Sequence, residues 1–297
     1  MNHNIIRVGL TILLLGIILI KVNLLELLNI FLSINVIFLI IALLVVVPIL
    51  YIIRAYKWNI FLRSVGIKKL FPNLIQVLLI GVFYGLVTPG KIGELARVYY
   101  LNEKKSETIP TVLLEKITDI LVLCVLCMIS IGVFYNNHNL KSVMLIFFLF
   151  FITGVWLLAN RTFTLFVTKL FKVNYDDADN YVNKLSSLFH NKCTLLKAVG
   201  LSAIYYLVAF VLGYVLLKSL NIDTSMLIAL PIIILMGNIP ITISGLGLRE
   251  SISAACFVLL GDSGVNGVTF SLLLFSVMIL FPGILGYFLT IRRDNYG

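Results

Sequence analysis

The sequence predicts an all-α integral membrane protein, built from six transmembrane helices and two opposed re-entrant helical hairpins. Three observations support this prediction: the composition, the lengths of the apolar runs and the positions of the basic residues. The chain of 297 residues is 61% hydrophobic and 12% charged, and its mean hydropathy is +1.09. Such a composition lies outside the range of soluble domains, so we expect the chain to fold in a bilayer.

Six apolar runs are long enough to cross a hydrocarbon core, which takes roughly 20 helical residues. They are residues 5–20, 36–53, 112–135, 143–159, 196–217 and 268–291. We therefore expect a single transmembrane domain over residues 1–297.

The net charge of +10 is concentrated in particular connections between these runs. Basic clusters fall at residues 54–69, 104–116, 161–197 and 292–293. Cytoplasmic loops are enriched in Lys and Arg, so this pattern predicts that both termini and the polar loop at about 161–195 are cytoplasmic in a multi-pass protein of the cell membrane. Membrane topology accounts for the positive charge, and we expect no nucleic-acid partner.

This topology holds on one condition, which concerns residues 72–102 (the first hairpin) and residues 226–260 (the second hairpin). Each must return to the side of the membrane from which it entered. The apolar arm at 74–88 has 15 residues, and as a helix it would rise about 22 Å, less than a core of about 30 Å. Pro89 and Gly90 then stop the helix, and Gly93 allows a second short helix to begin.

The second hairpin repeats the design of the first. An apolar arm is followed by a glycine-rich break at Gly245 and Gly247, and the charged pair Arg249 and Glu250 opens the next arm. Each hairpin also lies between two long runs. This predicts an inverted repeat with halves at about 35–135 and 196–291, the organisation in which transporters bind substrate at the repeat interface.

Helices that begin inside the membrane expose unpaired N–H groups and the positive end of their dipole, which attract anions such as phosphate. Lys91 and Arg97 at one break and Arg249 at the other add cations. Glu94 and Glu250 would pair with these cations when no lipid is bound. An approximate two-fold axis would bring Glu94 near Arg249 and Arg97 near Glu250. The alternative is that both motifs are interfacial loops wetted by headgroups.

A third group of charges, Glu115, Lys116 and Asp119, lies in the run 112–135. The two acids are four residues apart and share one helix face. They could line a headgroup entrance or bind a coupling cation; alternatively, they pair with Lys116 or Lys57. No nucleophile, metal cluster or nucleotide loop accompanies the acids, so we assign no catalytic residue, no metal and no cofactor.

Two further segments have simpler interpretations. The aromatic and basic stretch 51–63 is typical of an anchoring belt at a span end. The polar segment 174–192 carries Tyr181, Leu185 and Leu188 at helical spacing, which predicts a short surface helix.

Four stretches resemble the flippase-like family typified by the transmembrane region of lysylphosphatidylglycerol synthase, the multiple peptide resistance factor. They are "IRAYKW" (53–58), "TPGKIGELAR" (88–97), "LLEKITD" (113–119) and "ISGLGLRES" (243–251). The resemblance runs over nearly the whole chain. It implies transbilayer movement of a phosphate-bearing lipid, with Lys91, Glu94, Arg97, Arg249 and Glu250 as functional positions. Lys116 stands where the resemblance leads us to expect arginine.

The resemblance favours a transporter of an anionic phospholipid or polyprenyl-phosphate lipid, whose partners are membrane lipids. We expect no aminoacyl-transfer domain in this chain. A membrane lipid-phosphate transferase and a non-transporting scaffold for glycolipid synthesis are the alternatives. The sequence gives neither the lipid nor the oligomeric state.

Overall fold

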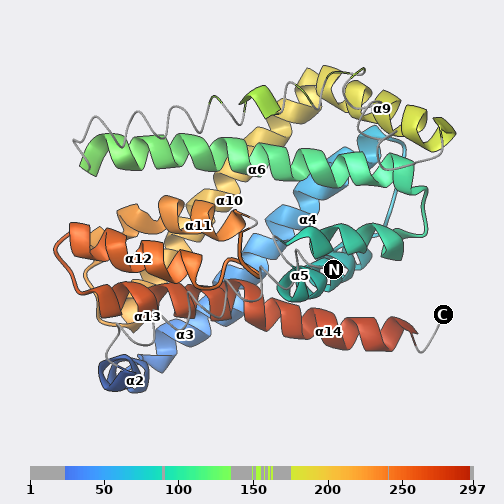
Figure 1. Cartoon of the computed structure of the whole chain (residues 1–297). Helices are drawn as coiled ribbons and strands as arrows, with labels where there is room; N and C mark the ends of the chain where they lie inside the picture. The colour runs from blue at the N-terminus through green and yellow to red at the C-terminus, as the bar shows by residue number, and fades with distance from the viewer. Residues whose placement is uncertain are drawn as a thin grey trace. The chain divides into compact units, whose positions relative to one another are not determined.

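The structure is a computed structural model that describes residues 24–88, 91–134, 149, 152–154, 157, 160, 162, 175–239 and 241–294 (Figure 1). All the secondary-structure elements in these ranges are helices of the α, 3₁₀ or π type. The prediction of an all-α chain is therefore confirmed for the part described. The predicted spans at 5–20 and, for the most part, at 143–159 lie outside it.

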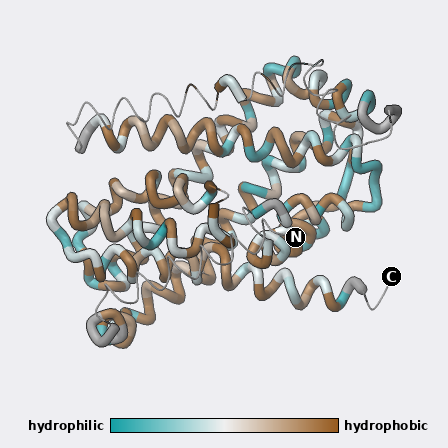
Figure 2. The backbone as a smooth tube through the Cα atoms, in the orientation of Figure 1, coloured by the Kyte–Doolittle hydropathy of each residue, from teal (hydrophilic) through white to brown (hydrophobic). Residues whose placement is uncertain are grey.

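Within the described residues, three helices are long and apolar enough to cross a membrane: Val36–Ser64, Lys192–Ser219 and Gly264–Arg292. They contain the predicted spans 36–53, 196–217 and 268–291. Helix α6 (Lys105–Phe134) contains nearly all of the run at 112–135. Hydrophobic colouring dominates these helices in Figure 2. The chain is thus a multi-pass membrane protein, while the count of six spans stays a prediction.

Two of the long helices are assembled from shorter pieces. The first consists of α3 (Val36–Ile41), the π-helical segment η1 (Ala42–Val46) and α4 (Val47–Ser64). The last consists of α13 (Gly264–Phe275), the π-helical segment η4 (Ser276–Leu280) and α14 (Phe281–Asp294). Lys192–Ser219 is the single helix α10, and α2 (Leu24–Leu32) precedes α3.

Each predicted hairpin contains two short helices separated by a break. In the first hairpin, α5 (Phe71–Val87) is followed by the 3₁₀ helix η2 (Ile92–Leu101). In the second, η3 (Thr224–Ala229) and α11 (Leu230–Asn238) are followed by α12 (Leu248–Leu259). The 17 residues of α5 rise about 26 Å, which is less than the hydrocarbon core. Re-entry into the membrane from opposite faces stays a prediction.

The chain forms two compact units. One comprises Met1–Ile52, Ile75–Arg97 and Tyr206–Gly297, and the other comprises Ile53–Leu74 and Val98–Tyr205. We call them the hairpin unit, because it holds both breaks, and the α6 unit. The predicted repeat halves draw on both units, and the inverted repeat itself stays a prediction.

In the α6 unit, the surface helix predicted at 174–192 is present as α9 (Tyr175–His190) and packs on α6. Its apolar face buries Val182, Leu185 and Leu188. Burial also raises the pKa of the Tyr181 hydroxyl above its usual value. The helical spacing read from the sequence is thus the spacing of the packed face.

Candidate functional site

The break of the second hairpin is a buried loop in which α11 ends against the start of α12. Ser244, Gly245 and Gly247 all have left-handed backbone conformations, with φ of +52°, +79° and +84°. A Cβ at Gly245 would lie 2.6 Å from the carbonyl oxygen of Gly237. Gly245 is therefore required both by its backbone conformation and by the close approach of α11.

Arg249 and Glu250 lie at the first turn of α12 and are buried, with 3% and 0% exposure. They pair with each other: Arg249 Nη2 lies 2.5 Å and Nε 3.1 Å from Glu250 Oε1. Ser271 of α13 bridges them, because its hydroxyl lies 3.0 Å from Arg249 Nε and 3.2 Å from Glu250 Oε1. The guanidinium also lies 4.8 Å from the ring centroid of Phe275.

The second carboxylate oxygen of Glu250 caps the helix, because it accepts the N–H of Gly247 at 2.7 Å. An acid at this position is favoured by the helix dipole. Three kinds of donor thus converge on one carboxylate: a guanidinium, a backbone N–H at a helix start and a hydroxyl. These are also the donors that protein sites use to bind phosphate.

Two more hydroxyls lie in the same loop. Thr242 is fully buried and Ser244 is 1% exposed, and neither hydroxyl oxygen has a hydrogen-bond partner among the described residues. Buried polar atoms ordinarily have partners. The loop therefore holds hydrogen-bonding capacity beyond what Glu250 uses.

At the break of the first hairpin, a second short helix begins near Gly93 as predicted. Among the described residues of this break, Lys91 has a left-handed backbone, with φ of +56°, whereas Gly93 is not among the residues of positive φ. Gly93 instead packs directly against the backbone of Tyr84 in α5, where a Cβ would collide. Thr88 ties the two arms together: its hydroxyl accepts the Gly93 N–H and donates to the Tyr84 carbonyl, both at 2.7 Å. Gly90 lies outside the described residues.

Glu94 and Arg97 are buried on the face of η2 that packs on α5, with 7% and 0% exposure. Glycines of α5 make room for them. A Cβ at Gly81 would lie 3.1 Å from Arg97 Cβ, and one at Gly85 would lie 2.9 Å from Glu94 Cγ. The solvated-loop alternative is therefore wrong for these two side chains, since both are packed inside the hairpin unit.

The two hairpins meet at a polar contact, in which Lys91 Nζ donates to Asn238 Oδ1 at 3.0 Å. Asn238 is the last residue of α11. The expected cross-pairs, Glu94 with Arg249 and Arg97 with Glu250, stay predictions; the pair that the structure contains joins Arg249 to Glu250. Asn238 escaped the sequence analysis because a single asparagine at a helix end carries no pattern.

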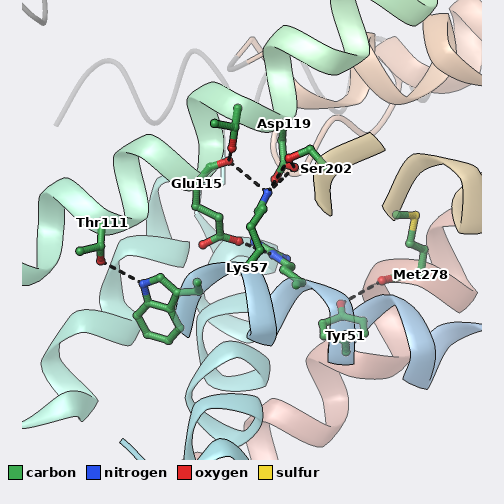
Figure 3. Close-up of polar contacts among 10 residues, drawn as sticks. Tyr51, Lys57, Thr111, Glu115, Asp119, Ser202 and Met278 are labelled. Atoms are coloured by element: carbon green, nitrogen blue, oxygen red, sulfur yellow. Dashed lines mark hydrogen bonds and ion pairs between the residues drawn. The ribbon is translucent and has the colours of Figure 1, made fainter. Parts of the chain in front are cut away.

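The α6 unit contains a separate buried cluster, centred on Lys57 of α4 (Figure 3). Lys57 is 2% exposed. Its ammonium pairs with Asp119 and donates to the Glu115 carbonyl at 3.2 Å and to the Ser202 hydroxyl at 3.1 Å. An ammonium has three N–H groups, so these three oxygens satisfy it. Ser202 in turn donates to Asp119 at 2.9 Å.

Glu115 pairs with Arg54, at 3.1 Å between Oε1 and Nε. The sequence alternative in which these acids pair with neighbouring cations is thus correct for Asp119 and Lys57. The partner of Glu115, however, is one that the sequence analysis did not assign. Lys116 is half-buried beside this cluster.

The anchoring-belt prediction is wrong for four aromatic or basic residues of 51–63, which are buried: Tyr51, Lys57, Trp58 and Phe61. The Trp58 indole N–H donates to Thr111 at 3.0 Å. The reason is that α4 packs against α6, which turns Lys57 and Trp58 inward. Tyr56, at 52% exposure, keeps the position expected of an anchor.

Among the residues that the structure describes, no group of three or more His, Cys, Asp and Glu side chains is placed to hold a metal ion. The charged groups that are present combine cations with hydroxyls and backbone N–H groups. Such sets suit anions better than metals.

Helices long enough to span a bilayer, together with buried charges at two helix breaks, define the class as multi-pass helical membrane proteins with polar sites in their interior. Residues 4–286 match the lysylphosphatidylglycerol synthase transmembrane region family. The chain belongs to this family.

A curated relative is similar over most of its length. It is a UPF0104 membrane protein of Methanocaldococcus jannaschii, 26% identical over 280 residues, which cover 82% of each chain. No solved structure matches the chain.

Proposed function

We propose that the protein is a flippase or transporter that moves an anionic, phosphate-bearing lipid across the membrane. The observation that carries the proposal is the set of donors around Glu250: Arg249, the Gly247 N–H and the Ser271 hydroxyl. All of them surround an acid that belongs to the chain itself.

In this proposal, Glu250 holds the place of the lipid phosphate when the site is empty. A buried arginine without a counter-ion would be strongly destabilising. A phosphate that displaces Glu250 takes over the guanidinium and the N–H, and the hydroxyls of Thr242 and Ser244 offer further donors. The exchange supplies what a transport cycle needs, a difference in interaction free energy between the empty and the loaded states.

Lys91 and Arg97 would provide the corresponding charges at the first break, with Glu94 as their acid. Lys91 reaches the end of α11, next to the second break. A headgroup that passes between the hairpins would therefore meet cations from both. We further propose that the two hairpins enter from opposite leaflets as halves of an inverted repeat.

The substrate class follows from this chemistry. The family is named for the transmembrane region of a synthase that makes a phospholipid. A phospholipid or a polyprenyl-phosphate lipid would each present an anionic phosphate on an apolar tail.

Reconstitution into vesicles tests the proposal. Purified protein is incorporated into liposomes that contain a headgroup-labelled phosphatidylglycerol in one leaflet, and movement and chemical identity of the lipid are measured together. Unchanged lipid in the opposite leaflet is the expected result. A new lipid product would identify a transferase. The absence of both lipid movement and a new product would favour a non-transporting scaffold. Each of these two outcomes would overturn the proposal.

We also propose that both termini and residues 161–195 face the cytoplasm. The native Cys193 reports on this, because it is free and exposed at the start of α10. A membrane-impermeant maleimide should label it in inverted vesicles and not in intact cells. Labelling in intact cells would overturn the topology; a variant with Cys193→Ser controls for the three buried cysteines.

A further inference from the structure

The long helix at Gly264–Asp294 is interrupted in its middle by η4. Within η4 the bonding is wider than in an α-helix, since Phe281 donates its N–H to the carbonyl of Ser276, five residues earlier. Such π-helical insertions frequently mark functional positions and kinks in helices. Pro282 follows directly, and it has no N–H to donate.

The missing N–H is the one that would reach Met278, four residues before Pro282. Tyr51 of α4 fills this gap, because its hydroxyl donates to the Met278 carbonyl at 3.1 Å (Figure 3). The backbone at this point is therefore held by a side chain from another helix rather than by the helix itself. A side-chain hydroxyl can release such a carbonyl without unwinding a helical turn.

The half of the helix before η4 packs on the second hairpin. Gly267 approaches α12 so closely that a Cβ would lie 2.6 Å from the Ser253 carbonyl oxygen. Phe270 stacks with Phe257 at 5.7 Å between ring centroids. Ser271 is also bonded to Arg249, so α13 and α12 are joined by close packing and by a hydrogen bond.

The half after η4 packs on the first hairpin. Gly283 and Gly286 of α14 lie against Leu86 and Leu79 of α5, where added Cβ atoms would collide. On the same face, the rings of Tyr287 and Phe83 lie 5.2 Å apart between centroids. The first hairpin is therefore attached to α14 in the way that the second is attached to α13.

We infer that η4 and Pro282 form a joint that lets the first hairpin, carried by α14, swing relative to the second hairpin, carried by α13. This joint lies midway along a helix that packs closely on both hairpins. Bending of the helix at this joint would break the hydrogen bond between Lys91 and Asn238, which connects the two hairpins. It would thereby open the space between them.

A matching irregularity lies in the helix that supplies Tyr51. There the Val47 N–H donates to the Ala42 carbonyl, five residues earlier, and Pro48 follows. Tyr51 thus comes from the turn after one π-helical segment and holds the carbonyl of another. The joint is built from two irregular helices that meet at one hydrogen bond. The role of this joint in lipid movement rests on the proposed function, whereas the existence of the joint does not depend on that function.

The test measures the distance between the hairpins. Spin labels are placed at Val87→Cys on α5 and Val258→Cys on α12, which are both exposed, in a chain whose four native cysteines are replaced. The distances between the two labels are recorded by pulsed electron paramagnetic resonance in phosphatidylcholine nanodiscs with and without phosphatidylglycerol. We expect two populations whose ratio shifts with the anionic lipid.

Pro282→Ala restores an N–H for the Met278 carbonyl, so it should stiffen the joint and leave a single population. Pro110→Ala is the matched control, because Pro110 lies inside α6, away from any π-helical segment, and should keep the wild-type populations. Tyr51→Phe removes only the hydroxyl and should broaden the distribution; it serves as the second variant if Pro282→Ala does not fold.

One fixed distance in the wild-type protein under both conditions would overturn the joint. The joint would also be overturned if both Pro282→Ala and Tyr51→Phe had the same distribution of distances as the wild-type protein. Lipid movement measured on the same samples separates the two proposals. Moving hairpins without lipid movement would support the joint and refute the transport function, whereas lipid movement at a fixed distance would refute the joint alone.

Discussion

Two buried cations, Lys57 and Arg249, are neutralised in different ways. The counter-ion of Arg249 is its own neighbour Glu250. The oxygens around Lys57 come from two other helices, α6 and α10. Burial of a charge requires a partner in either case, but the counter-ion of Lys57 comes from another helix, whereas that of Arg249 comes from its own helix and Ser271 of α13 adds only a neutral hydroxyl. The comparison suggests that the Lys57 cluster stabilises the α6 unit, whereas the Arg249 pair can exchange its acid for a ligand.

The largest expected effect is the loss of the Lys57 ammonium. Lys57→Met leaves Asp119 without its counter-ion, and breaking a buried pair in this way costs about 3–5 kcal/mol. We expect a loss of that size in the free energy of unfolding, measured by denaturant titration in mixed micelles.

The double variant Lys57→Met with Asp119→Asn should recover part of this loss, since it leaves no bare charge. Lys184→Met is a control, because Lys184 has a single long contact of 3.5 Å to the Val65 carbonyl. Equal destabilisation by Lys57→Met and Lys184→Met would contradict the role assigned to the cluster.

A smaller effect should arise at the second break. Gly245→Ala combines a left-handed backbone, which costs an L-residue about 1–2 kcal/mol, with overpacking against Gly237, which costs about 1–3 kcal/mol. Gly261 provides the control: its φ is +89° and a Cβ there meets no atom within 4 Å. Gly261→Ala should therefore show the backbone contribution alone. The two variants would unfold at the same denaturant concentration if the close approach at Gly245 were unimportant.

The smallest effect concerns the start of η3. Asp223 caps this helix by accepting the Ser225 N–H at 3.1 Å, and its pKa is lowered chiefly by this bond. A lowered folded-state pKa means that the cap stabilises the fold above the ordinary pKa of aspartate and ceases to do so as the pH falls through the lowered value. Asp223→Asn keeps a capping side chain and should lose this acid dependence. If Asp223→Asn had the same dependence of melting temperature on pH as the wild-type protein, the stabilising role assigned to the Asp223 cap would be contradicted.

Much of the fold could be predicted from the sequence because it depends on local patterns. The apolar runs predicted the long helices, and the period of Tyr181, Leu185 and Leu188 predicted α9. The break after Thr88 and the break around Gly245 were also predicted, because proline and glycine interrupt helices wherever they occur.

What the sequence could not reveal depends on contacts between distant segments. Lys57 could be named as a partner of Asp119, but its contact with Ser202 of α10 and the pairing of Glu115 with Arg54 follow no local pattern. Gly93 looks like a turn glycine, yet its role is to let η2 approach Tyr84, while Lys91 takes the left-handed conformation. The joint at η4 is hidden for the same reason, since Pro282 and Tyr51 are far apart in the sequence.

Arg249→Gln tests the central claim most directly. The measurement is the transbilayer movement of labelled phosphatidylglycerol in proteoliposomes, beside that of a diacylglycerol analogue that has the same tails and label but no phosphate. The account predicts that wild-type protein moves only the phosphate-bearing lipid, and that folded Arg249→Gln protein loses this activity about tenfold or more, as expected for an interaction worth about 1.4 kcal/mol or more in the transition state. Equal movement of both lipids by the wild-type protein, or full activity in Arg249→Gln, would contradict it.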